Sequence, residues 1–225
     1  FPGDMTAPHL PNAQELASMA DMLDASGDYR VLRRLVPKSR YTDDDGTALK
    51  KAIFLDVETT GLDASRHEII ELAMVPFTYA QDGRIFSIGE AFQALREPSH
   101  PIPPEITAIT GIDDAMVAGK SIDVKEVSSF IADADLIIAH NAGFDRRFME
   151  IFCDDFTHKP WACSMSQIDW QGEGFEGQKL VWLAAGAGFF YEKHRAIHDC
   201  RAGIELLARP LPKSGEPGLR QLLAR

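Results

Sequence analysis

One short stretch, residues 52–62, constrains the fold of this chain more than any other. It reads AIFLDVETTGL, an apolar run of strand length followed by two acids and a break at Gly61. The apolar run predicts a buried β-strand. Side chains two residues apart in a strand lie on the same face, so the carboxylates of Asp56 and Glu58 are predicted to lie side by side.

Two carboxylates at this spacing repel each other, and each raises the pKa of the other unless a cation lies between them. A hard divalent cation with oxygen ligands meets that requirement. The alternative is a strand that simply ends in polar residues at the surface. The strand by itself favours neither interpretation, so the choice depends on the rest of the chain.

The length and charge of the chain limit what it can bind. Its 225 residues and 45% hydrophobic content suffice for one α/β domain with a single large core. A formal net charge of −11 argues against a broad phosphate-binding surface. A nucleic acid would therefore be held by local features, namely bound metal ions, helix N-termini and a few basic side chains.

The cysteines and the lack of long apolar segments bear on the compartment. Cys153, Cys163 and Cys200 are far apart in apolar surroundings, and no CxxC pattern occurs, which predicts free thiols in a reducing compartment. No apolar run approaches the roughly 20 residues needed to span a bilayer, and no signal peptide is recognisable. We therefore expect a cytoplasmic protein that does not bind membranes.

Residues 1–50 form an extension with its own pattern. Its start is expected to be disordered up to residue 10, and apolar spacing after Asn12 predicts a helix that ends near Gly27. The most basic stretch of the chain follows at residues 28–41. It is either a contact for nucleic acid or a partner, or an arm that packs on the core, and we favour the arm. Its apolar side chains are Val31, Leu32 and Leu35.

The remaining pattern predicts one domain over residues 51–210 and a tail over 211–225. After the first strand, further strands are expected at 68–77, 84–94, 136–140 and 161–163. Helices are expected from about 105, after Asn141, and over 124–131, 179–187 and 196–208. An Asp-Gly pair joins the second and third strands as a hairpin, so the first three strands form an antiparallel meander.

Two further acids lie in the first turns of predicted helices. Asp145 follows the strand 136–140, and Asp199 lies in the last long helix. Each helix begins where a strand or loop ends, so Asp145 and Asp199 can meet Asp56 and Glu58 at one edge of the sheet. We call these four residues the four acids.

Three segments resemble the motifs of a known family. They are DVETTGL (56–62), HNAGFD (140–145) and HRAIHD (194–199). They look like the motifs of the DEDDh 3′-to-5′ exonucleases, and most of all like the DnaQ-like group of the epsilon proofreading subunit of bacterial DNA polymerase III. The segment Thr110-Gly111-Ile112 fits the family's loop between the first and second motifs. The resemblance covers residues 51–208 and implies a ribonuclease H-like fold, a mixed five-stranded sheet flanked by helices.

The resemblance also implies a two-metal site. The four acids would hold two divalent cations, Mg²⁺ or Mn²⁺, with Asp56 bridging them. His194 matches the family's general base, and histidine titrates near neutral pH. His198 is the competing candidate. Adjacent residues in a helix point about 100° apart, so His198 and Asp199 do not easily serve one site.

For the substrate, the resemblance implies that the terminal nucleotide contacts the backbone after Glu58 and three side chains beyond it. These are Thr59, Thr60 and Leu62. Ile109 or Ile112 is expected to wedge against the terminal base. Aromatic rings offer candidate stacking faces, although Phe144 and Phe148 are better explained as core residues. The stacking candidates are Phe144, Phe148, Trp170 and Phe175.

Basic and imidazole side chains near the second motif are weaker candidates. Arg146 and Arg147 either meet phosphate or form a plain solvated face. His140 ends a buried strand and is expected to be a hydrogen-bonded core residue. Asn141 is expected to cap the helix that follows it.

The expected activity is release of nucleoside 5′-monophosphates from single-stranded DNA 3′ ends, in proofreading, repair or DNA turnover. One alternative is a 3′-to-5′ exoribonuclease that resembles oligoribonuclease or ribonuclease T. Another is a non-catalytic module that binds nucleic acid or a polymerase. The intact acids and His194 argue against such a module, because a pure binder has no use for a costly carboxylate cluster. A polymerase or another replication or repair protein is a candidate partner, and no convincing clamp-binding peptide is present.

Overall fold

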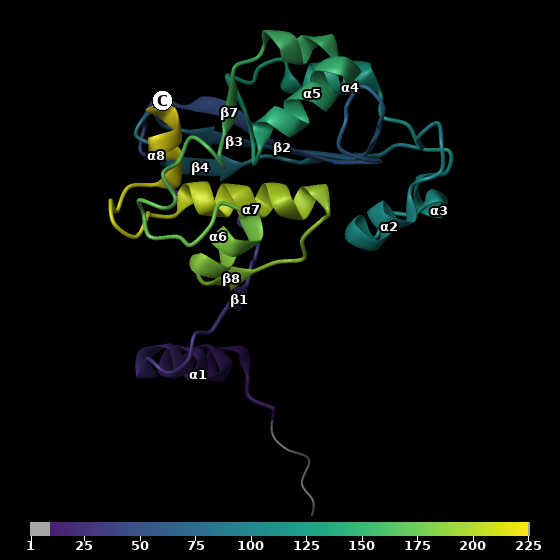
Figure 1. Cartoon of the computed structure of the whole chain (residues 1–225). Coiled ribbons are helices and arrows are strands. Elements are labelled where there is room, and N and C mark those ends of the chain that lie inside the picture. The colour runs from purple at the N-terminus through teal and green to yellow at the C-terminus, as the bar shows by residue number, and fades with distance from the viewer. Residues whose placement is uncertain (1–9, 225) are drawn as a thin grey trace, which may run out of the picture.

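A mixed sheet runs through the middle of the structure, a computed structural model that describes residues 10–224 (Figure 1). The strands lie in the order β4 (Ile85–Ile88), β3 (Ile69–Tyr79), β2 (Lys50–Thr59), β6 (Leu136–Ala139) and β7 (Trp161–Cys163). β2, β3 and β4 form the predicted antiparallel meander, and β6 and β7 run parallel to β2. Disorder was expected over residues 1–10, and all of these except residue 10 lie outside the described part.

The strand expected over residues 84–94 is two strands, which raises the strand number of the sheet from five to six. β4 pairs with the end of β3, whereas β5 (Phe92–Leu95) pairs with residues 71–74 of β3. Pro76 lies between these two registers and has no N–H to donate, so the ladder is interrupted there. The Gly89 N–H bonds the Pro76 carbonyl at 2.8 Å, just after the end of β4.

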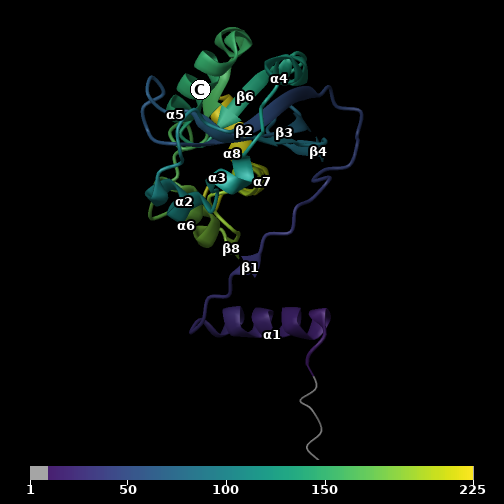
Figure 2. The same ribbon diagram turned by 90° about the vertical axis from the view of Figure 1, so that its right-hand side faces the viewer.

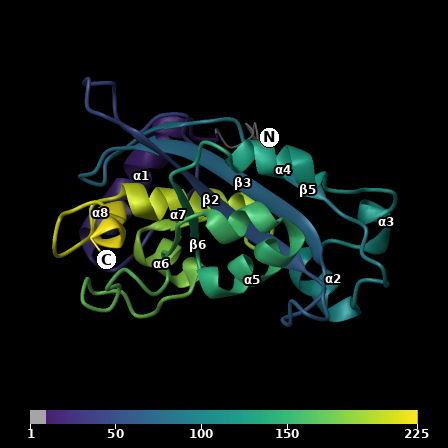
Figure 3. The ribbon, with the colours of Figure 1, turned by 90° about the horizontal axis from the view of Figure 1, so that it is seen from above.

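Helices cover both faces of the sheet, and β2 divides its side chains between them. Ala52 and Phe54 face a core formed with α6 (Leu180–Gly186) and α7 (Ala196–Ala208). Ile53 and Leu55 face a second core with α4 (Val124–Ile131) and α5 (Ala142–Phe152). Figure 3 looks onto the face that α4 and α5 cover. This alternation is the period of a strand buried on both sides.

Several short elements were not expected from the sequence. After the predicted helix α2 (Pro104–Thr110), the helix α3 (Asp114–Val117) adds to a small third core. The 3-10 helix η1 (Asp154–His158) follows α5. In the expected tail, α8 (Gly218–Leu223) buries Leu219 and Leu222 against the core of α7. Among the described residues, no helix is long and apolar enough to cross a membrane.

The extension contains a detached helix and a packed arm. α1 (Ala13–Ser26) begins at the Asn12 capping box and ends at Gly27, as predicted, and it lies apart from the sheet without a buried residue (Figure 2). The basic arm then pairs β1 (Arg33–Arg34) in parallel with β8 (Phe189–Phe190). Leu35 packs against the core, as predicted for the apolar side chains of the arm. Leu32 stays exposed.

Close contact between α7 and β2 depends on Gly203. A Cβ atom at this position would overlap the ring of Phe54. We predict that Gly203→Ala lowers the free energy of unfolding by roughly 2 kcal/mol, because overpacking forces the helix off the strand. Urea denaturation measures the change.

The matched control is Gly143→Ala in α5, where a Cβ would meet open space. Helix propensity there favours alanine by up to about 1 kcal/mol, so Gly143→Ala should be neutral or stabilising. Equal effects of the two substitutions would contradict the proposed close contact at Gly203.

Candidate metal centre

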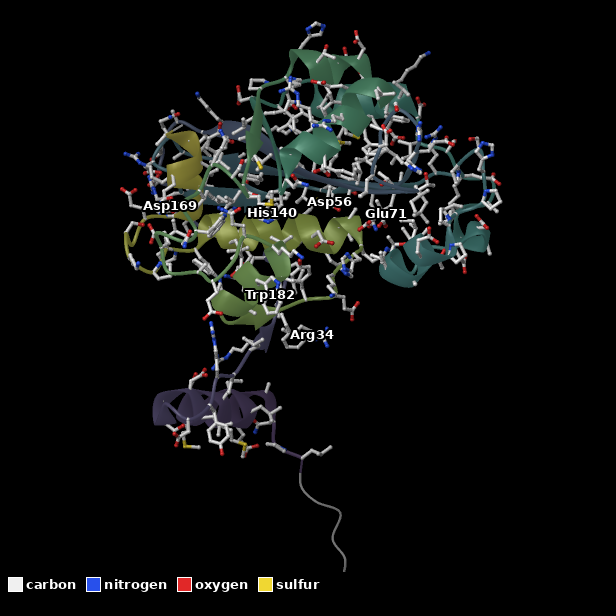
Figure 4. All side chains as sticks on the ribbon, in the orientation of Figure 1. Arg34, Asp56, Glu71, His140, Asp169 and Trp182 are labelled. Atoms are coloured by element: carbon white, nitrogen blue, oxygen red, sulfur yellow. The ribbon has the colours of Figure 1, made fainter. Side chains whose placement is uncertain are left out.

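Three of the four acids converge between β2 and α7. Asp56 and Glu58 lie on β2 with the side chains that face α7, and Asp199 lies in the first turn of that helix. One carboxylate oxygen from each residue lies within 4.8 Å of the other two. Figure 4 shows Asp56 between the sheet and α7. The structure thus brings three of the four predicted site acids together.

The fourth acid, Asp145, reaches the same strand from α5. Its side chain is buried, and its Oδ1 accepts a hydrogen bond of 3.2 Å from the backbone N–H of Val57. Asp145 therefore lies next to the strand segment that carries Asp56 and Glu58. The helix is not capped as predicted. Asn141 has a φ of 78°, and its side chain makes no capping hydrogen bond, because the chain turns into α5 through the left-handed region.

Two hydrogen bonds hold the Asp199 carboxylate. The Tyr191 hydroxyl donates to Oδ1 at 2.8 Å, and the backbone N–H of His194 donates to Oδ2 at 2.9 Å. His194 has a φ of 64°, a conformation that a residue with a side chain rarely adopts. The bend places His194 directly beside Asp199. Tyr191 was not identified from the sequence.

The two candidate histidines of the third motif differ in their surroundings. His198 places its Nδ1 3.0 Å from the backbone oxygen of Glu192, so its ring is held by the loop before α7. No such bond holds the His194 ring within residues 10–224. This difference favours His194, although its role as general base stays a prediction.

A fifth acid, Glu71 of β3, adjoins the cluster and was missed by the sequence analysis. It lies opposite Glu58 in the antiparallel register, is fully buried, and also faces α7 (Figure 4). The Arg195 guanidinium lies 2.8 Å from its Oε1, and the Ala196 N–H donates to its Oε2 at 3.0 Å. This ion pair fixes the start of α7. The signal available in the sequence was a lone acid in the apolar strand IIELAMV.

Burial and mutual repulsion dominate the electrostatics of the cluster. Burial, followed by the charges of Asp145, Asp199, Glu58 and Glu71, raises the pKa of Asp56 well above its usual value. Burial, followed by the neighbouring acids, raises the pKa of Glu58 to about 8. Burial raises the pKa of Asp145 to about 7. At neutral pH these carboxyls therefore need protons or cations.

The residues present fit a divalent metal centre. All of the candidate ligands are carboxylate oxygens, the ligand type preferred by Mg²⁺ and Mn²⁺. Glu71 and Asp199 receive hydrogen bonds from neighbouring groups. Within the described part of the chain, no side chain donates to the carboxylates of Asp56 or Glu58. These two acids are therefore the natural place for a cation.

The predicted substrate residues fall into two groups. Thr59 and Thr60 use their hydroxyls within the turn after β2, with Thr59 Oγ1 2.7 Å from the Gly61 carbonyl and Thr60 Oγ1 accepting from the Glu68 N–H at 3.0 Å. In contrast, Leu62 is 85% exposed and Ile109 is 53% exposed. These two apolar side chains are open to a ligand.

Other substrate candidates belong to the core. Ile112 is fully buried, so the expectation that it wedges against a base was wrong and Ile109 is the remaining candidate. Trp170 is also buried and donates its Nε1–H to the Ser164 carbonyl, so it offers no stacking face. Phe148 is buried, and Phe144 lies half-buried with its ring centre 5.0 Å from that of Phe148.

The remaining candidates have structural partners. His140 lies 2.9 Å from the Ser164 hydroxyl and 2.7 Å from the Gln178 carbonyl, and burial lowers its pKa to about 4. It is the hydrogen-bonded core residue that was predicted. Arg146 pairs with Glu150 at 2.6 Å, whereas Arg147 is exposed.

The raised pKa values predict how stability depends on pH when no divalent ion is bound. Over the range from 4.5 to about 8, folded Glu58 keeps a proton that the unfolded chain loses. Its contribution to stability is therefore full below pH 4.5 and is lost as pH rises toward 8, and Asp145 acts in the same direction.

We expect the chelated protein to lose unfolding free energy as pH rises from about 4.5 to 8. Denaturant titrations in the presence of a chelator measure this loss. The Glu58→Gln variant should show a shallower pH dependence, and added Mn²⁺ should restore stability at the alkaline end. The same slope in Glu58→Gln and the parent protein would contradict the assignment.

The buried ion pair predicts a large effect of removing its cation. Arg195→Ala leaves the Glu71 carboxylate buried without a counter-charge, so we expect a loss of roughly 3 kcal/mol in unfolding free energy. Arg146→Ala is the matched control, because its pair with Glu150 is exposed to solvent and is worth less than about 1 kcal/mol. Similar losses in both variants would rule out the anchoring role of Arg195.

The comparisons with known proteins agree with this geometry. A family model described as Exonuclease matches residues 53–207. The DNA polymerase III subunit epsilon of Treponema pallidum is 32% identical over 67% of this chain and 72% of its own length. The PolC-type DNA polymerase III of Bacillus subtilis is 30% identical over 75% of this chain. The chain spans only 12% of the length of that polymerase.

A solved structure supports the fold. Escherichia coli exonuclease I in complex with a 5cy-dA13 oligonucleotide superposes with a TM-score of 0.58 at 19% identity, over 76% of this chain and 42% of the other. The likeness confirms the ribonuclease H-like fold expected from the sequence. With the family match over residues 53–207, it follows that this chain belongs to the exonuclease family.

Proposed function

We propose that this protein is a metal-dependent 3′-to-5′ exonuclease that removes nucleoside 5′-monophosphates from single-stranded DNA ends. The observation that carries the proposal is the approach of Asp56, Glu58 and Asp199 within 4.8 Å of one another. Asp145 adjoins them through the Val57 N–H. Buried acids this close together repel one another unless cations lie between them. Two bound cations are also what metal-dependent hydrolysis of a phosphodiester requires.

The four acids would hold two divalent cations, Mg²⁺ or Mn²⁺. When bound, such ions activate the attacking water and stabilise the leaving oxygen. His194 would serve as the general base that accepts a proton from the attacking water. Its position is set by the N–H bond to Asp199, and the start of α7 is set by the pair of Arg195 with Glu71.

The substrate contact is proposed to be short. The net charge of −11 opposes an extended nucleic-acid surface, so recognition concentrates on the terminal nucleotides. Exposed Leu62 and Ile109 supply apolar contacts for the terminal base, and the backbone after Glu58 supplies polar ones. Phe144, half-buried beside Asp145, is a further candidate contact.

DNA is favoured over RNA as the substrate by the comparisons. The two relatives named above are a DNA polymerase III subunit epsilon and a PolC-type DNA polymerase III, and the superposed exonuclease I was solved with an oligonucleotide. By the same reasoning, a polymerase or another replication or repair protein is the proposed partner. An exoribonuclease resembling ribonuclease T is the second candidate, because a two-metal site does not itself distinguish the sugars.

The decisive test is digestion of end-labelled single-stranded DNA with Mg²⁺ or Mn²⁺. We predict that a chelator stops digestion and that Asp56→Asn lowers the rate by about a thousandfold or more, since the proposed bridging ligand loses its charge. Asp63→Asn makes the same chemical change at an exposed residue in the turn after β2 and should leave the rate unchanged.

Undiminished digestion by Asp56→Asn would exclude the proposed site. Matched DNA and RNA strands, digested in parallel, test the substrate. A large preference for RNA would replace DNA by RNA as the substrate and leave the site assignment intact.

A further inference from the structure

The N-terminal extension touches the loop that leads into the third motif. The Arg33 N–H bonds the Gly188 carbonyl at 3.1 Å, and the Leu35 N–H bonds the Phe190 carbonyl at 2.8 Å. The Arg34 guanidinium lies 5.0 Å from the centre of the Phe190 ring. These arm residues precede the segment 53–207 that matches the exonuclease family.

The contacted strand leads directly to Asp199. β8 ends at Phe190, and the next residue, Tyr191, donates its hydroxyl to Asp199 Oδ1 at 2.8 Å. Tyr191 and Leu35 pack against the same core and line one surface hollow. The arm, the strand and the carboxylate are thus joined by continuous contacts.

The Tyr191 bond restricts how Asp199 can rotate. The other oxygen, Oδ2, already accepts from the His194 N–H, so the two donors together fix the plane of the carboxylate. A metal ligand that is held in this way presents its lone pairs in one direction. Without the hydroxyl, only the His194 N–H orients Asp199.

We infer that Tyr191 is a positioning residue for Asp199, and that the N-terminal extension acts on the metal centre through it. The inference rests on the proposed function, because it assigns Asp199 as a metal ligand. The coupling extends to α1. Its Asp21 and Asp24 pair with Arg33, and Asp24 also accepts from the Val31 N–H.

The first experiment compares two tyrosine variants by Mn²⁺ binding, read from the electron paramagnetic resonance signal of the free ion. Tyr191→Phe keeps the ring and removes the hydroxyl, and we expect about tenfold weaker binding, as for other groups that orient metal ligands. Tyr41→Phe is the matched control. It removes the hydroxyl that bonds Glu205 at 2.6 Å, also from the arm to α7, and it should leave Mn²⁺ affinity unchanged.

Thermal unfolding without metal separates positioning from stability. Tyr191→Phe should melt within a few degrees of the parent protein, and saturating Mn²⁺ should restore most of its nuclease rate. Unchanged Mn²⁺ affinity in Tyr191→Phe would overturn the inference. A parent protein that neither binds Mn²⁺ nor digests DNA would instead overturn the proposed function.

The second experiment tests the arm in the full chain. Leu35→Pro removes the N–H that bonds Phe190, whereas Val36→Pro changes the next residue, which is exposed and whose N–H bonds no backbone carbonyl in residues 10–224. We expect weaker Mn²⁺ binding only in Leu35→Pro. In the Tyr191→Phe background, Leu35→Pro should weaken Mn²⁺ binding little further, because the hydroxyl through which the arm acts on Asp199 is already absent. Equal effects of Leu35→Pro in both backgrounds would show that the arm does not act through Tyr191.

Discussion

Repulsion between buried carboxylates is the constraint on which the rest of this structure depends. Asp56, Glu58 and Asp199 bring negative oxygens within 4.8 Å, and Glu71 and Asp145 adjoin them. Apolar packing on both faces of β2 holds these groups together against their repulsion. The approach of α7 is close enough that the helix has a glycine where it crosses Phe54. The fold therefore concentrates charge that protons or cations must balance.

The acids of the cluster differ in how many neighbouring groups stabilise their charge. This difference indicates where a cation would bind. Glu71 has Arg195 and a backbone N–H, and Asp199 has the Tyr191 hydroxyl and the His194 N–H. In contrast, the main influences on Asp56, which are burial and the charges of the neighbouring acids, all raise its pKa. A carboxylate that is surrounded by other carboxylates and lacks a protein donor gains most from a bound metal ion.

The sequence predicted elements and residues whose signals are local. The apolar pattern placed α4 and α7 correctly, and the motif spacing identified the four acids. Features set by distant partners were missed. Glu71 depends on Arg195, 124 residues away along the chain, and the break at Gly89 depends on its register with Pro76. The left-handed conformation of Asn141 was missed because asparagine before a helix is also the usual signal of a side-chain cap.

The contact between the arm and the exonuclease-family segment has the properties expected of a contact that can open and close. β1 and β8 are two residues each, and a two-stranded pairing of this size is only marginally stable in water. Opening it would also separate Leu35 from the core that Phe189 of β8 shares with α7, whereas the second core, formed with α4 and α5, contains no residue of the arm. Because Tyr191 directly follows β8, opening would loosen one of the two donors to Asp199 while the other remains. The extension is thus suited to adjusting the proposed metal affinity by a modest factor, while β2, α5 and α7 keep the acids in place.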